Sequence, residues 1–214
     1  MGEEELRSGG LGLILTPMVA ILALLGPIVA LEAWWSLQTV DTRVFFLIFS
    51  TVGIFTWTNF LIMAILLLIS TLKTTRRFKD NQAGTIGAMF GIFTAILYLL
   101  YHTLPLLGIG MELQQIMGYW TLLPNPIFES LNVIGSILLG LSMSLIGVFF
   151  LVYREYFSNS GIWLAAGITF IMGGIFSLTI LLTSIGIILL FFAGVIGAAS
   201  FLITEALESY NESE

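Results

Sequence analysis

Long apolar runs separated by short polar segments make up most of this sequence. The hydrocarbon core of a bilayer is about 30 Å thick, so a helix needs about 20 apolar residues to cross it. Four runs reach that length and predict membrane spans at residues 11–31, 44–72, 85–107 and 131–153. The second run is longer than required, so we expect that helix to tilt or to extend beyond the bilayer.

The last apolar tract, residues 161–204, is too long for a single span. A straight helix of this length would reach about 66 Å, roughly twice the thickness of the hydrocarbon core. The polar, β-branched stretch 179–186, which includes Thr183, Ser184 and Gly186, predicts a hairpin turn, which gives a fifth span at residues 161–180 and a sixth at 186–204. The alternative is one long helix, which would give five spans in total.

The predicted fold class is therefore all-α: a polytopic transmembrane helical bundle of six spans over residues 11–204. Acidic tails flank it at residues 1–10 and 205–214, and residues 112–129 are expected to lie on the membrane or to cap the bundle. Composition supports this prediction, since 58% of the residues are hydrophobic and 9% are charged, against about 25% charged in soluble domains. The mean hydropathy is +1.05.

The basic residues predict the orientation of the bundle. Six spans place six of the seven Lys and Arg residues on one side of the membrane. Because basic loops stay in the cytoplasm, we expect both termini to be cytoplasmic in a protein of the plasma membrane. Four of these residues, Lys73, Arg76, Arg77 and Lys79, form a cluster that could hold anionic lipid head groups at about 1 kcal/mol each. The simpler interpretation is that this basic cluster only sets the orientation of the protein in the membrane.

Ionisable side chains are almost absent from the predicted spans. Proton relays and ion-coupled carriers use such groups within the membrane, and here only His102 remains, with an interfacial position as its simplest interpretation. The chain has no Cys and none of the short motifs of metalloproteases, serine hydrolases or phosphate-binding loops. The sequence thus predicts neither an enzyme nor a cofactor or metal site.

One polar group does lie in the middle of a span. Thr56, Thr58 and Asn59 are close together in the second span, and we consider them a candidate polar cavity. The alternative is that the amide of Asn59 bonds a neighbouring helix, an interaction worth about 0.6 to 2 kcal/mol in membranes.

Small residues recur every fourth position on three of the spans. Such ridges let helix backbones approach closely, within one chain or between two copies. The predicted packing ridges are Gly87, Gly91 and Ala95 on the third span, Ser136, Gly140 and Ser144 on the fourth, and Gly194 with Ala198 on the sixth.

The C-terminal third resembles a known group of proteins. The matching residues are Tyr153-Arg154-Glu155-Tyr156-Phe157, Ser160-Gly161, Ala166-Gly167, Gly173-Gly174 and Gly197-Ala198-Ala199-Ser200-Phe201. Over residues 131–201 this pattern is similar to a family of small, uncharacterised archaeal multi-pass membrane proteins. The resemblance implies an archaeal source, but the family has no assigned activity and supplies no site residues.

A non-catalytic membrane component accounts best for the lack of charges, motifs and soluble domains. We expect a structural, assembly or accessory subunit of a membrane complex, in contact with lipids and with another membrane protein or a second copy. Nucleic acid is not an expected partner, because no basic footprint is present. The alternative is a channel or facilitator for a neutral or weakly polar solute, built around Asn59 and a first helix kinked at Pro17 and Pro27.

Overall fold

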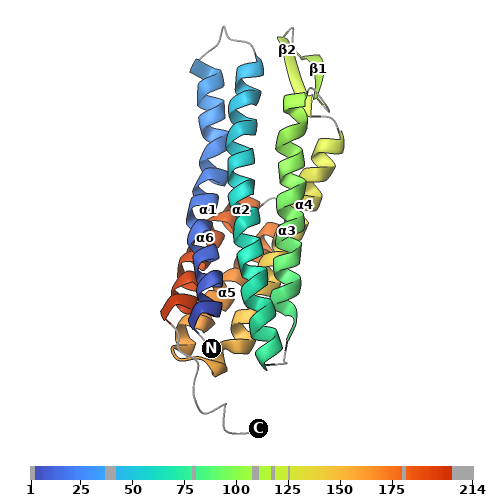
Figure 1. Cartoon of the computed structure of the whole chain (residues 1–214). Helices are drawn as coiled ribbons and strands as arrows, with labels where there is room; N and C mark the ends of the chain where they lie inside the picture. The colour runs from blue at the N-terminus through green and yellow to red at the C-terminus, as the bar shows by residue number, and fades with distance from the viewer. Residues whose placement is uncertain are drawn as a thin grey trace.

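Six long helices and one β-hairpin make up the part of the chain that the computed structural model describes: residues 3–36, 42–78, 81–107, 111–116, 119–124, 126–179 and 182–203 (Figure 1). The helices are α1 (Glu3–Ser36), α2 (Thr42–Phe78), α3 (Ala83–Thr103), α4 (Pro126–Tyr153), α5 (Ser160–Leu178) and α6 (Thr183–Ile203). Each contains a segment long and apolar enough to cross a membrane. The prediction of an all-α fold with six membrane-spanning helices is confirmed.

The last apolar tract folds back on itself, so the alternative of one long helix is wrong. The end of α5 is closed by Thr179, whose hydroxyl and backbone N–H both donate to the carbonyl oxygen of Phe176, at 2.7 and 3.3 Å. These two bonds occupy the carbonyl group of Phe176, so they compete with the backbone hydrogen bonds that would continue the helix.

Two features of the fold go beyond the hydropathy pattern. Both α1 and α2 are longer than the predicted spans, because hydropathy marks the lipid-crossing part of a helix and not its ends. The connection between α3 and α4 begins with a 3₁₀ turn at Leu104–Leu107 and then forms an antiparallel hairpin of β1 (Met111–Ile116) and β2 (Tyr119–Pro124). This pairing satisfies the backbone groups of a segment that no helix includes.

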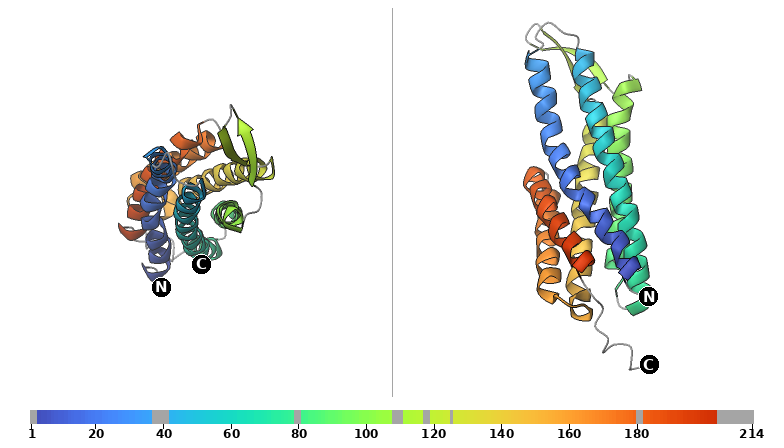
Figure 2. Two further views of the ribbon diagram at one scale, coloured as in Figure 1. Left: turned by 90° about the horizontal axis from the view of Figure 1, so that it is seen from above. Right: turned by 60° about the vertical axis from the view of Figure 1, so that its left-hand side comes forward.

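The helices form a ring in sequence order, in which α6 returns to pack against α1 (Figure 2). Along the α1–α6 contact, Gly194 lies opposite Thr16, and Gly10 lies opposite Leu202. The start of α1 and the end of α6 are therefore at the same end of the ring. We call this the basic end, because Arg7, Lys73, Arg76 and Arg154 lie there. The opposite end, which carries β1 and β2, is the hairpin end.

Glycine residues set the spacing between neighbouring helices. On α4, a Cβ atom at Gly147 would lie 2.7 Å from the carbonyl oxygen of Gly167 on α5, and one at Gly140 would lie 2.8 Å from that of Gly174. Helices in lipid associate through close packing, because lipid supplies no hydrophobic drive. The backbones of α4 and α5 are thus in direct contact at two levels, one on each side of the middle of the bundle.

The residues of the predicted ridges lie in such helix contacts within the chain. Gly87 approaches the backbone of α4 at Ser142 and Ile146, and Gly91 approaches the Ser142 hydroxyl and Ala64. Ser142 in turn donates to the carbonyl oxygen of Gly87 at 2.7 Å. Ser144 lies against Gly174 of α5. The remaining ridge residues are also buried in the bundle: Ala95, Ser136, Gly140, Gly194 and Ala198.

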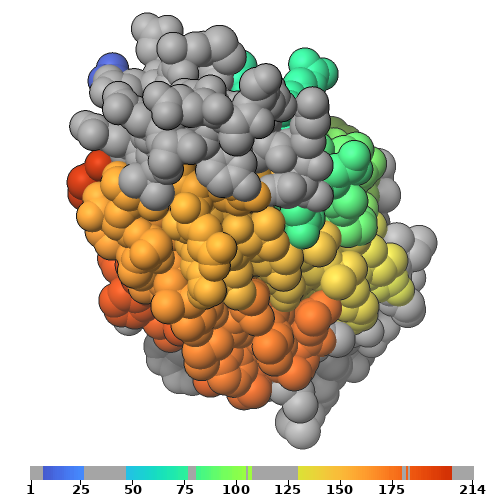
Figure 3. Space-filling view, turned by 90° about the horizontal axis from the view of Figure 1, so that it is seen from below, coloured from blue at the N-terminus to red at the C-terminus, as the bar shows by residue number. Residues whose placement is uncertain are grey.

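Aromatic side chains fill the ring over its basic-end half. Trp163 is fully buried and stacks on Phe157 at 4.5 Å, while Phe150 stacks on Phe170 at 5.6 Å. Phe201 of α6 meets Trp163 edge-on at 5.4 Å. Seen from the basic end, α4 and α5 form a continuous surface where no grey atoms cover them (Figure 3). The interior is therefore closed at this level.

Candidate functional site

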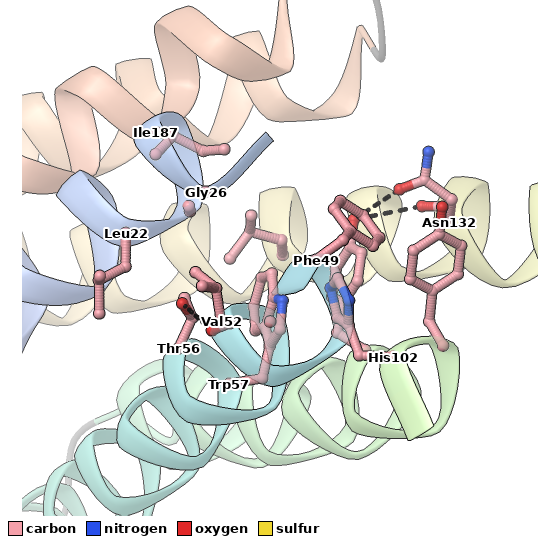
Figure 4. Close-up of a pocket in the computed structure, with 14 residues that line it drawn as sticks. Leu22, Gly26, Phe49, Val52, Thr56, Trp57, His102, Asn132 and Ile187 are labelled. Carbon is pink, nitrogen blue, oxygen red and sulfur yellow. Dashed lines mark hydrogen bonds between the residues drawn. The ribbon is translucent and has the colours of Figure 1, made fainter. Parts of the chain in front are cut away.

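A pocket of about 190 Å³ lies inside the bundle toward the hairpin end (Figure 4). Its walls come from α1, α2, α3 and α4, with Ile187 of α6 as the single contribution from the last two helices. The pocket exists because α5 and α6 are short: they cover the basic-end part of the ring, while α1 and α2 continue past them (Figure 2). No side chain from α5 fills the interior at this level.

Aromatic rings from two neighbouring helices form one wall. Trp57 of α2 stacks on Tyr98 of α3 with 4.0 Å between ring centroids and only 10° between planes. The ring of His102 lies 4.8 Å from that of Phe49 and 5.1 Å from that of Tyr101. On α3, Tyr101 and His102 follow Tyr98 by three and four residues, and on α2, Trp57 follows Phe49 by eight. Side chains at these intervals lie on one face of a helix.

Gly53 makes room for His102. A Cβ atom at this position would collide with the imidazole ring, so the ring lies directly against the backbone of α2. This close approach buries His102 almost completely, with 7% of its surface exposed. The expectation that the polar edge of His102 would be exposed to water is therefore wrong, since the ring is buried against α2.

The polar groups of the wall differ in how they are bonded. The Tyr98 hydroxyl donates to Asn132, whose carbonyl oxygen and Oδ1 lie 3.3 and 3.2 Å away, and it also lies 3.0 Å from the hydroxyl of Ser136. Thr56 donates to the carbonyl oxygen of Val52 at 2.7 Å, which leaves its own oxygen free to accept. Tyr98 is thus fixed between α3 and α4.

Two polar groups of the pocket residues have no partner in the described part of the chain. Nδ1 of His102 is fully buried and forms no hydrogen bond there. The indole N–H of Trp57 forms none with any described residue either, and Figure 4 shows it on the pocket side of α2. An unsatisfied buried polar group costs about 1–3 kcal/mol. Nδ1 of His102 lies against the backbone of α2 at Gly53, so the indole N–H of Trp57 is the unused group on the pocket side.

The three residues of the candidate polar cavity do not come together. Thr56 borders the pocket, but Thr58 is exposed on the outside of the bundle. Asn59 is half-buried, and its amide donates to the carbonyl oxygen of Phe55 in its own helix at 2.8 Å. Successive residues of a helix point about 100° apart, so Thr58 is turned about 200° away from Thr56. The signal in the sequence for the pocket wall was the four-residue spacing of Gly53 with Trp57 and of Tyr98 with His102, because residues four apart lie on one helix face.

The basic cluster lies where α2 ends. Lys73 and Arg76 are exposed at this end of the helix. The side chain of Arg77 and the whole of Lys79 fall outside the described residues, so binding of lipid head groups by the cluster stays a prediction. Across the described ranges, no group of three or more His, Cys, Asp or Glu residues could hold a metal ion.

We expect Tyr98→Phe to lower the free energy of unfolding by about 1 kcal/mol, since the hydroxyl bridges two helices and such bonds have that magnitude in membrane proteins. The effect can be isolated in a double-mutant cycle with Ser136→Ala, measured by reversible unfolding in detergent. The two losses should not add, because each change breaks the same contact. Strict additivity would show that the 3.0 Å contact contributes nothing.

No protein-family model matches this chain, and no curated protein or solved structure matches it either. The resemblance of the C-terminal third to archaeal multi-pass proteins stays a prediction.

Proposed function

We propose that this six-span integral membrane protein is a non-catalytic component of a membrane complex, acting as a structural, assembly or accessory subunit. The closed interior of the basic-end half is the observation that supports this proposal. Phe149, Phe150, Tyr153 and Trp163 are fully buried there, so large aromatic side chains fill this half of the bundle. A pocket at the hairpin end beside this packed half suits a protein that binds without transporting.

The distribution of charge supports the same proposal. Within the six apolar segments the charged residues Arg7, Lys73, Arg76, Arg154 and Glu155 all lie at the basic end, and His102 is the single histidine of the sequence. Coupled transport and acid–base catalysis in membranes use ionisable groups deep within the spans.

The proposed orientation has both termini in the cytoplasm of a cell whose plasma membrane holds the protein. It rests on the basic end, where Arg7, Lys73, Arg76 and Arg154 come together, whereas Arg43 at the start of α2 is the one basic residue of the hairpin end. Basic residues near the ends of spans are retained on the cytoplasmic side.

Cysteine labelling tests the orientation directly, because the chain has no Cys of its own. We expect Leu107→Cys at the hairpin end, where 67% of the residue is exposed, to react with a membrane-impermeant maleimide in intact cells. Glu155→Cys at the basic end, where 77% of the side chain is exposed, should react only after the cells are permeabilised. The opposite labelling pattern would refute the proposed orientation.

The facilitator alternative predicts flux that the accessory-subunit proposal excludes. We expect proteoliposomes to swell in urea or glycerol at the rate of protein-free liposomes, and a faster, protein-dependent rate would overturn the proposal. In native membranes, crosslinking before solubilisation should yield a stoichiometric second membrane protein. A monodisperse homo-oligomer that conducts solute would contradict it.

A further inference from the structure

The pocket lies within the depth of the membrane. Its residues belong to the apolar, membrane-spanning segments: Leu22 to α1, Trp57 to α2, Tyr98 to α3 and Leu139 to α4. Neighbouring helices close it on three sides, since α1 packs on α2, α2 on α3, and α3 on α4. On the fourth side, between α1 and α4, Ile187 near the start of α6 is the one lining residue among those that the structure describes. A ligand would reach the pocket from the lipid on this side.

The size of the pocket suits one substituted ring. An apolar cavity of about 150 Å³ holds a benzene molecule, and the volume here is about 190 Å³. The walls are ring faces and edges together with aliphatic side chains, which favour a planar group through stacking and edge-to-face contacts. Among the described residues, none that lines the pocket is charged, which favours a neutral group.

The unused hydrogen-bonding groups specify the substituents. The indole of Trp57 can only donate, so its partner must be an acceptor, such as a carbonyl, ether or hydroxyl oxygen of a neutral molecule. Nδ1 of His102 forms no hydrogen bond with the described residues and is buried beside the same wall. A site built to bond such an oxygen discriminates strongly against molecules that lack it.

We propose that the pocket binds the ring of a membrane-soluble quinone, with Trp57 donating to a ring oxygen and the apolar tail lying in the lipid between α1 and α4. The proposal concerns binding and requires no electron transfer by the chain. It is independent of the orientation and of the accessory role. An ester carbonyl of a glycerolipid could accept the same hydrogen bond, but its flexible chains would gain little from an aromatic wall.

The test uses the purified full chain in phosphatidylcholine nanodiscs, titrated with a decyl-substituted benzoquinone. We expect saturable binding of one quinone per chain. Ala23 lines the pocket on α1. In Ala23→Leu the larger side chain should occupy part of the space that the ring needs, and forcing both into it is costly. We therefore expect binding to weaken at least about tenfold. The matched control Ala165→Leu adds the same atoms to an exposed position of α5 and should leave affinity unchanged.

A second variant tests the hydrogen bond and does not depend on filling the pocket. Trp57→Phe keeps an aromatic ring but removes the indole N–H, so affinity should fall about threefold to tenfold, the range of one neutral hydrogen bond. Quinones quench indole fluorescence, and the four remaining tryptophans of Trp57→Phe should report the weaker binding as saturable quenching at a correspondingly higher quinone concentration.

Three results would overturn the proposal. The first is equal quinone affinity in wild type and Ala23→Leu, which would place the quinone elsewhere. The second is a tightly bound glycerolipid, seen by native mass spectrometry, that Ala23→Leu loses and quinone fails to displace. The third is saturable quenching in Trp57→Phe at the same quinone concentration as in the wild type. Normal binding by Ala165→Leu together with a loss in both pocket variants would support it.

Discussion

Phe170→Ala is expected to lower the free energy of unfolding by about 3 kcal/mol, the largest loss from any of the substitutions proposed. Phe170 is 1% exposed and stacks on Phe150. Its ring also lies so close to α6 that a Cβ atom at Gly197 would be 3.2 Å from it. Truncating a buried Phe to Ala costs about 3–5 kcal/mol in soluble proteins. We expect the lower end of this range. A Phe side chain in lipid is already in an apolar environment, so its truncation costs mainly the loss of packing contacts and little free energy of transfer from water.

The same truncation on the lipid-facing surface serves as the control. Phe192 of α6 is 51% exposed, so Phe192→Ala should change the free energy of unfolding by less than about 0.5 kcal/mol. Both variants can be compared by reversible unfolding in mixed detergent micelles. Equal losses from the two variants would mean that the aromatic cluster does not stabilise the bundle.

Gly147→Ala is expected to cost about 2 kcal/mol, although it adds only one methyl group. The new Cβ atom would lie 2.7 Å from the carbonyl oxygen of Gly167 and 2.9 Å from the backbone nitrogen of Ile171. Neither backbone atom can move without shifting α5 away from α4. Overpacking of this kind costs about 1–3 kcal/mol, and the better helix propensity of Ala offsets part of it.

Gly161→Ala is the matched control for this substitution. Gly161 lies near the start of α5, and a Cβ atom there would meet nothing within 4 Å. We expect a neutral or slightly stabilising effect, measured as the midpoint of thermal unfolding in detergent. If Gly147→Ala unfolds at the same temperature as Gly161→Ala, the contact between α4 and α5 is looser than the structure indicates.

Hydropathy was sufficient to predict the six spans, because the thickness of the hydrocarbon core fixes how long an apolar run must be. The turn at Thr179 was predictable for the same reason, since one helix could not contain the last tract. The β-hairpin was not predicted, because a short polar and aromatic segment outside the lipid carries no comparable constraint.

The pocket depends on which face of α2 points inward, and hydropathy does not encode this. Phe55 faces outward and Trp57 inward, yet both are large and apolar. In lipid the two environments are equally apolar, so the alternation that marks a buried face in water is absent. Gly53 and Gly91 are better indicators of the inward face, because a neighbouring side chain lies directly against the helix backbone at each of them.

The short α5 and α6 give the molecule two flanks of different height. The 19 residues of α5 span about 28 Å, whereas the apolar segment of α2 covers 30 residues and about 45 Å. Lipids beside α5 and α6 therefore meet a lower apolar wall than those beside α2, and the bilayer must deform between them. Mismatch of this kind costs fractions of a kcal/mol per Å. A neighbouring protein with equally short helices would share that deformation, so thickness alone favours its association with this flank.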